Sequence, residues 1–178
     1  NNENDEYINI SAKLWLSDPL TTLMDSSLIN PFIQFTTSTM QNVILQDVLK
    51  RDNKYILNGP YCHIINSNEY SNINSFKNFN YGDIGLDEIM LYYHVDTIQR
   101  YLYEDLGYDN IQHKSITVTP NATIDDQSWF DPSTNGLYFG TGGIPDAYDA
   151  TVIWHEYAHA MAFEILHIDM WDNYDFGG

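Results

Sequence analysis

The pentapeptide His155-Glu156-Tyr157-Ala158-His159 constrains the fold of this chain more than any other feature. It places two histidines four positions apart in a stretch without proline or glycine after Pro145. Residues four apart on an α-helix differ by only about 40° in direction, so both imidazoles can reach one metal ion from the same face. The carboxylate of Glu156 then lies where it can take a proton from a water bound to that ion. The sequence therefore predicts a metal helix over about residues 147–167.

The flanks of this motif predict that the helix is buried or half-buried. Its apolar stripe consists of Val152, Ala158, Ala162, Ile165 and Leu166. Two interpretations of the histidines compete: a hydrogen-bonded pair in the core, and a metal site. Two histidines, a glutamate and a tyrosine in such a stripe are costly without a compensating partner, and we therefore favour the metal site.

The composition limits the possible partners. The chain has 178 residues, of which 43% are hydrophobic and 15% aromatic, enough for the core of one domain or of one lobe of a larger protein. Its formal net charge of −18 argues against nucleic acid and anionic membrane surfaces as partners. No apolar run approaches the roughly 20 residues of a membrane span. The acidity suits an extracellular setting and Ca²⁺ as a further metal besides Zn²⁺, although no calcium-binding loop is recognisable.

Residues 1–82 predict a β-rich N-terminal region. Strands are expected over residues 40–48, 55–57 and 61–65, with a turn at Asn58-Gly59-Pro60. Residues 66–80 are predicted as a polar loop without a core of its own. The polar N-terminus carries no signal peptide, so a secreted chain is expected to begin after processing or within a longer protein.

Residues 83–178 form the second predicted region, where the periodicity becomes helical. Apolar residues three to four apart predict a long helix at about 87–107, which ends at Gly107. A strand over residues 111–119 and a hairpin at about 126–140 precede the metal helix. The predicted fold class is therefore α+β, with an antiparallel or mixed β-sheet, one long helix and the metal helix.

Three further features have structural interpretations. His94, on the long helix, is expected to be a core residue, and the lone Cys62 a small buried hydrophobe. The turn Gly140-Thr141-Gly142-Gly143 is not followed by the lysine of a phosphate-binding loop. We expect its glycines to let the backbone pass close to the metal helix and the cleft.

Several segments together resemble the thermolysin-like and fungalysin-like metallopeptidases, which are secreted gluzincins. The most specific resemblance is the block His155–His159, of the form H-E-Y-x-H, which follows Asp146 and Asp149. Weaker similarities extend over most of the chain, at Asp18–Thr22, Leu57–Tyr61, Asp87–Met90, Tyr92–Asp96, Gln99–Tyr101 and Phe139–Gly143. The resemblance implies a zincin-type N-terminal lobe.

The resemblance also implies roles for individual residues. His155 and His159 would be the zinc ligands, and Glu156 the base that activates water. The edge strand that pairs with the substrate backbone would contain Gln127, Ser128, Trp129 and Phe130. The family usually has Asn-Ala at the first two of these positions, so this chain departs from the pattern in the details of substrate recognition. Asp149 matches an acidic position before the first ligand, and we expect a structural role for it.

A third zinc ligand is implied as well, a glutamate on a second helix, which we expect beyond Gly178. Glu164 is on the same helix as the histidines and points about 140° away from His159. The other acidic residues after the motif are Asp169, Asp172 and Asp175. We therefore expect a C-terminal lobe of the same protein, absent from this chain, to complete the site.

Together these observations predict a secreted zinc-dependent endopeptidase that hydrolyses peptide bonds with a metal-activated water, with a peptide or protein as substrate. A zinc hydrolase of other amides or esters would use the same helix. The main alternative is non-enzymatic: an extracellular surface, filament or adhesion module derived from the gluzincin fold. The 14 tyrosines and the many asparagines and serines favour that alternative, whereas the intact glutamate of the motif disfavours it.

Overall fold

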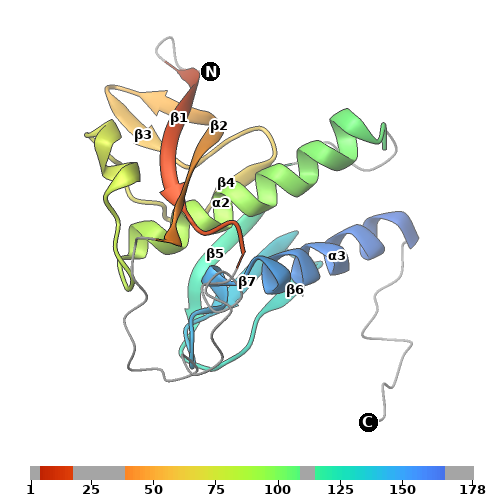
Figure 1. Ribbon diagram of the computed structural model, residues 1–178. Helices are drawn as coiled ribbons and strands as arrows, with labels where there is room; N and C mark the ends of the chain where they lie inside the picture. The colour runs from red at the N-terminus through yellow and green to blue at the C-terminus, as the bar shows by residue number, and fades with distance from the viewer. Residues whose placement is uncertain (1–4, 18–38, 109–114, 167–178) are drawn as a thin grey trace.

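The computed structural model describes residues 5–17, 39–108 and 115–166, and it shows an α+β fold (Figure 1). The predicted fold class is confirmed at this level, because the strands of the described residues form two sheets that pack with two α-helices. Neither of these helices has the length and apolar character that are needed to span a bilayer.

The first sheet is antiparallel and comes from the predicted β-rich region. Its strands, in spatial order, are β1 (Glu6–Leu14), β2 (Gln41–Arg51) and β3 (Lys54–Ile56). The pairing of β1 with β2 shifts register between Ile8 and Ile10. At this irregularity Asp47 has a φ of 50° and donates its backbone N–H to the side chain of Asn9. The strands predicted over residues 40–48 and 55–57 are thus confirmed, with small shifts of their ends.

The second sheet is mixed. Its strands, in spatial order, are β4 (Cys62–Ile64), β5 (Ile116–Thr123), β7 (Gly136–Gly140) and β6 (Trp129–Asp131). β4, β5 and β7 run parallel to one another, whereas β6 and β7 form an antiparallel hairpin. The predicted hairpin is therefore confirmed, and β6 is an edge strand. Of the strand predicted over residues 111–119, positions 111–114 lie outside the described residues, and β5 continues four residues further than predicted.

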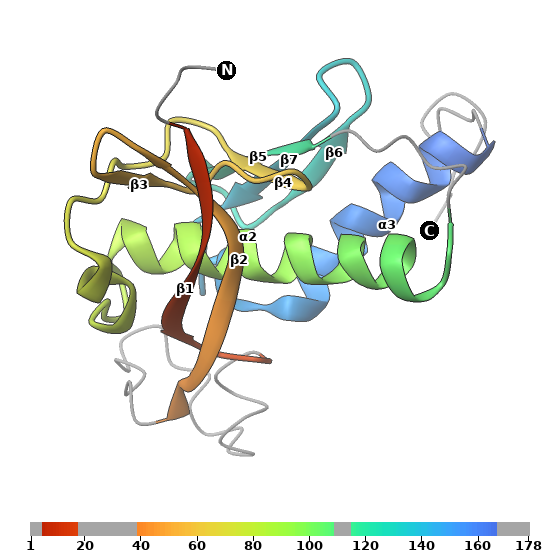
Figure 2. The same cartoon turned by 90° about the horizontal axis from the view of Figure 1, so that it is seen from above.

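The long helix lies between the two sheets (Figure 2). α2 spans Ile84–Arg100, and the chain continues as a π-helix, η4 (Tyr101–Asp105). Gly107 has a φ of 67°, which confirms the end predicted for this helical segment. Because α2 contacts both sheets and the second α-helix, its side chains are buried on nearly all sides.

The polar segment at residues 66–80 does contribute to the core, which corrects the prediction of a loop without one. It contains a short 3-10 helix, η3 (Ile73–Lys77), in which Phe76 is fully buried. The ring of Phe76 makes edge contacts with those of Tyr55, Tyr70 and Phe79. Three aromatic residues among asparagines and serines, Tyr70, Phe76 and Phe79, anchor this segment, and they do not recur at a regular helical or strand spacing.

One hydrophobic core joins the two regions that the sequence divides at residue 82. β4, from the first region, pairs with β5, from the second, and the core extends from Ile10 to Ala160. Cys62 and His94 are buried in this core, as predicted. The Nε2 atom of His94 lies 3.0 Å from the carbonyl oxygen of Trp15, and burial lowers the pKa of His94 to about 4, so the ring is neutral and donates this hydrogen bond.

A buried carboxylate on α2 lacks a full set of partners. Asp87 is 6% exposed, and its Oδ1 atom accepts no hydrogen bond within the part of the chain that the structure describes. Burial raises the pKa of Asp87 to about 6 and outweighs the hydrogen bonds from Tyr148 and Asn121, which lower it. The folded protein therefore binds a proton at Asp87 more tightly than the unfolded protein does.

We expect Asp87→Asn to stabilise the protein at neutral pH and to have little effect near pH 4. The stability that the protonated carboxyl contributes is fully present below about pH 4 and is lost as the pH rises through about 6. Asparagine stays neutral throughout, so at neutral pH the variant should gain about 3 kcal/mol, at about 1.4 kcal/mol for each pKa unit. The measurement is the free energy of unfolding by denaturant between pH 4 and pH 8.

The matched control is Asp105→Asn, which removes the same charge from an exposed position on η4. This control should show no comparable gain at neutral pH. A gain for Asp87→Asn that is equally large at pH 4 and pH 8 would contradict the assignment, because it could not come from the burial of a charge.

Candidate metal centre

The two histidines of the motif lie on α3, which spans Ala150–Leu166 and follows a 3-10 turn, η5 (Asp146–Tyr148). The helix starts at Asp149, whose carboxylate accepts hydrogen bonds from the N–H and the hydroxyl of Thr151, at 2.7 and 2.6 Å. The carbonyl oxygen of Asp149 accepts the N–H of Ile153. These are the contacts of an N-cap residue, in keeping with the structural role expected for Asp149.

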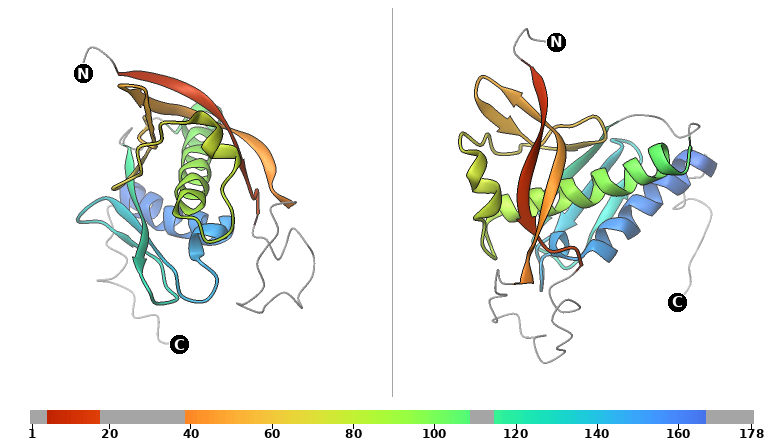
Figure 3. Two further views of the ribbon diagram at one scale, coloured as in Figure 1. Left: turned by 90° about the vertical axis from the view of Figure 1, so that its left-hand side faces the viewer. Right: turned by 45° about the horizontal axis from the view of Figure 1, so that its top comes forward.

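α3 runs beside α2 and contacts the edge strand β6 (Figure 3), but its most buried residues are not those of the apolar stripe that its sequence predicted. Its buried residues, which lie on one face of the helix, are Ala150, Ile153, Glu156, Tyr157 and Ala160. Of the predicted apolar stripe, Val152 and Ala162 are half-buried, whereas Ala158 is exposed and Ile165 is 54% exposed, so the stripe is confirmed only in part. The buried face contains a glutamate and a tyrosine. Because a helix face is recognised in a sequence by regularly spaced apolar residues, this face could not be recognised.

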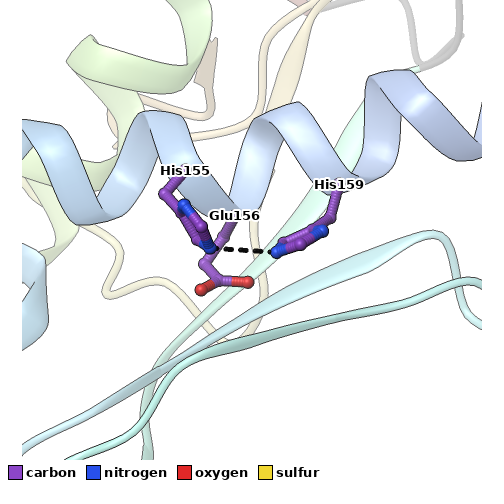
Figure 4. Close-up of side chains that lie close together, drawn as sticks. All are labelled: His155, Glu156 and His159. Atoms are coloured by element: carbon purple, nitrogen blue, oxygen red, sulfur yellow. Dashed lines mark hydrogen bonds between the residues drawn. The ribbon is translucent and has the colours of Figure 1, made fainter. Parts of the chain in front are cut away.

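The side chains of His155, Glu156 and His159 meet on one side of α3 (Figure 4). The Nε2 atoms of His155 and His159 are 3.0 Å apart, and the two rings are nearly perpendicular, with 4.6 Å between their centroids. One potential ligand atom from each of His155, Glu156 and His159 lies within 4.8 Å of the others. Across the described ranges, no other set of three histidine, cysteine, aspartate or glutamate side chains converges in this way.

This geometry fits a tetrahedral zinc ion. Two Zn–N bonds of about 2.05 Å at the tetrahedral angle hold their nitrogens about 3.3 Å apart, so the two imidazoles need to separate only slightly. The core-histidine interpretation fits less well, because His155 is exposed and His159 only half-buried. Burial and the neighbouring His155 lower the pKa of His159, which keeps its ring neutral and its lone pair available to a metal.

Glu156 has a different environment from the histidines. It is 7% exposed, and burial raises the pKa of its carboxyl above the usual range. His155 and a hydrogen bond from the backbone N–H of Phe130 act in the opposite direction, and Asp146 raises the pKa further. A carboxylate that is buried beside a metal position and has a raised pKa is a stronger base than an exposed glutamate.

The structure divides the four predicted substrate-binding residues into two groups. Gln127 and Ser128 line a pocket together with His155 and Glu156. The side chains of Trp129 and Phe130 do not line this pocket and pack against other aromatic rings. Trp129 stacks on Tyr138 with 5.0 Å between ring centroids, and the buried Phe130 packs against Phe163 of α3. Only the backbone of these two residues is therefore placed to meet a ligand at the edge of the sheet.

The pocket beside the motif has a volume of about 480 Å³. Its lining consists of Asp126, Gln127, Ser128, Asp146, Thr151, Val152, His155 and Glu156. The hydroxyl of Ser128 donates to Asp146 at 2.6 Å and thereby ties the start of β6 to the turn before α3. Sequence reasoning gives Asp126 and Asp146 no role at this site. The signal that could have found them is the concentration of aspartates on both sides of the predicted hairpin.

The glycine-rich turn is required by a close approach of the backbone. A Cβ atom on Gly140 would lie 2.3 Å from the carbonyl oxygen of Asp125, and one on Gly142 would lie 2.3 Å from the backbone nitrogen of Asp126. The predicted close passage is therefore confirmed, but the neighbour is the loop at residues 125–127 and not the metal helix. This packing holds one wall of the pocket in place.

The third zinc ligand stays a prediction. The cluster of convergent ligand atoms in the described residues contains His155, Glu156 and His159 but not Glu164. Glu164 lies instead where its charge acts on Tyr103 of η4. The other candidates, Asp169, Asp172 and Asp175, lie outside the described residues.

Comparison with known proteins adds no assignment to this geometry. No protein-family model matches the chain, and no curated protein matches it.

Proposed function

We propose that this protein hydrolyses peptide bonds with a zinc ion held by His155 and His159. The observation that carries the proposal is the meeting of the two Nε2 atoms at 3.0 Å with the carboxylate of Glu156 beside them. A purely structural zinc site does not need a glutamate between its histidines, whereas a hydrolytic site needs a base next to the bound water.

Each of the three residues has one task in this proposal. Zinc, when bound, lowers the pKa of a coordinated water and polarises the carbonyl group of the scissile bond. His155 and His159 direct their Nε2 lone pairs at the metal position. Glu156 accepts the proton of the water and returns it to the nitrogen of the leaving amine. Its burial in the pocket wall raises the pKa of its carboxyl, which makes it a better acceptor for this proton.

The substrate would lie as an added strand along β6. The position of β6 at the edge of the second sheet supports this, because an edge strand leaves backbone groups unpaired on one side. One of its donors, the N–H of Phe130, is hydrogen-bonded to Glu156. A bound peptide would therefore compete with Glu156 for that donor, and Gln127 and Ser128 would contact the peptide from the pocket.

The resemblance to thermolysin-like and fungalysin-like enzymes extends the proposal. By this resemblance the chain would be the zincin-type N-terminal lobe of a secreted enzyme. The third zinc ligand would be a glutamate of the C-terminal lobe. The order of the elements supports this: a long helix, a hairpin with an edge strand, a glycine-rich turn and the motif helix follow one another.

We expect metal removal to abolish hydrolysis reversibly. Treatment of the protein with a zinc chelator should lower the cleavage of an unfolded casein-like substrate by at least about 100-fold, because the Lewis acid contributes several kcal/mol to the barrier. Stoichiometric Zn²⁺ should restore the rate, and Mg²⁺, which prefers oxygen ligands, should not. Peptidase activity that persists in the metal-free protein would refute the proposed function.

The non-enzymatic alternative loses part of its support in the structure. The tyrosine content of the chain is one argument for this alternative. Four of the tyrosines, however, are buried: Tyr92, Tyr103, Tyr148 and Tyr157. These side chains fill the core and are not available for contacts between subunits of a filament or surface layer.

A further inference from the structure

The pocket beside Glu156 has acidic walls from three different elements. Asp126 comes from the loop before β6, Asp146 from η5, and Glu156 from α3. The ion pairs of the described residues include neither Asp126 nor Asp146. Two carboxylates without a basic partner beside the proposed metal centre favour a ligand that supplies a positive charge.

No basic residue from this part of the chain offsets these charges. Residues 115–166 contain no lysine or arginine, and the seven basic residues of the chain all lie at or before Lys114. The same segment contains seven acidic residues, namely Asp125, Asp126, Asp131, Asp146, Asp149, Glu156 and Glu164. The charged side chains that act on Asp146 and Glu156 belong to the motif itself and to neighbouring aspartates. The negative potential of the pocket is therefore not cancelled locally.

The arrangement suits a long cationic side chain better than a metal ion. Carboxylates that share one metal ion bring their oxygen atoms together around it, but Asp126, Asp146 and Glu156 do not form such a cluster among the described residues. The pocket is also lined by Val152, which is half-buried. This apolar wall can pack against the hydrocarbon stem of a lysine or arginine while the charged end meets the carboxylates.

We propose that this pocket selects a lysine or arginine side chain of the substrate beside the bond that is cleaved. The inference rests on the proposed function, because it makes the pocket a substrate subsite of the metal centre. Asp126 and Asp146 attract the charged end, and the hydrogen bond from Ser128 holds Asp146 in position. The same charges draw cationic peptides toward the site at low ionic strength.

The test is equilibrium binding to the metal-free protein, so that the proposed hydrolysis plays no part in it. Two fluorescent peptides of otherwise neutral sequence differ only at a central position, which is arginine in one and the uncharged near-isostere citrulline in the other. At low salt the arginine peptide should bind at least about fivefold more tightly, the ratio that corresponds to one modest ion pair. The ratio should fall toward one at high salt.

Asp126→Asn should reduce this ratio, because Asp126 is exposed on the loop and its replacement changes the charge with little effect on the fold. Asp146→Asn should reduce it as well and still accept the Ser128 hydroxyl. Glu69→Gln is the matched control, since it removes one negative charge from an exposed position that does not line the pocket, and it should leave the ratio unchanged. Equal binding of the two peptides to wild-type protein, or a ratio that Glu69→Gln lowers as much as Asp126→Asn, would overturn the proposal. Displacement of the arginine peptide by one equivalent of Ca²⁺ would overturn it in favour of a metal.

Hydrolysis of the same peptides by the zinc-loaded protein separates this inference from the proposed function. A preference for arginine in binding without any cleavage, in a protein that includes the expected C-terminal lobe, would support the pocket and refute the peptidase. Cleavage of both peptides at equal rates, with equal affinities, would support the peptidase and refute the pocket.

Discussion

In the complete protein, with the expected C-terminal lobe, replacing Glu156 with glutamine should lower zinc-dependent peptide hydrolysis by about 10²–10⁴-fold while the zinc content stays nearly unchanged. The side chain is not needed to hold the metal in the proposed site, because His155 and His159 supply the converging nitrogens. Glutamine has the same shape and can still accept the N–H of Phe130, so the contact with β6 is retained. What it cannot do is accept a proton from the bound water. The measurements are the steady-state rate on a casein-like substrate and metal analysis of the same preparations.

The matched control for this variant is Glu164→Gln, which makes the same chemical change on the same helix outside the cluster of ligand atoms. It should retain the wild-type rate. If Glu156→Gln keeps activity within about tenfold of the wild type, Glu156 is not the general base. If the variant instead loses its zinc, the residue acts as a ligand and the assignment of tasks within the motif is wrong.

Much of the fold could be predicted from the sequence, because it is specified by short-range patterns. The end of the long helix at Gly107 and the hairpin of β6 and β7 follow from local turn and capping chemistry, and both are confirmed. What the patterns miss depends on tertiary contacts. Phe76 makes η3 part of the core only because Tyr70 and Phe79 of the same segment and Tyr55 of β3 surround it.

The same distinction applies to the candidate site. The convergence of His155 and His159 could be predicted, because it depends only on the pitch of one helix. The buried face of α3 could not, because Glu156 and Tyr157 occupy it in place of apolar residues. The acidic pocket requires Asp126 and Asp146 to meet across a hairpin and a turn, and nothing in their sequence spacing of 20 positions indicates that they would.

We expect His159→Ala to weaken zinc binding by at least about 100-fold. Loss of a residue that merely orients a ligand already costs about 10–100-fold in metal affinity, so loss of a ligand should cost at least the upper value. Zinc should also stop stabilising the variant: a ligand at 100 times its Kd stabilises the folded state by about 2.7 kcal/mol, and this gain falls below 0.5 kcal/mol when the affinity drops 100-fold. The measurements are competition with a chromophoric chelator and the free energy of unfolding with and without zinc.

His63→Ala provides the control, because His63 is a half-buried histidine on β4 that does not belong to the cluster of ligand atoms. Its zinc affinity should equal that of the wild type. The double variant His155→Ala/His159→Ala completes the test, since two ligands of one ion act as a unit and the second substitution should cost less than the first. Additive losses would indicate two separate zinc sites. Tight stoichiometric zinc in the double variant would place the metal elsewhere in the protein and leave the short contact between the two imidazoles as a hydrogen bond alone.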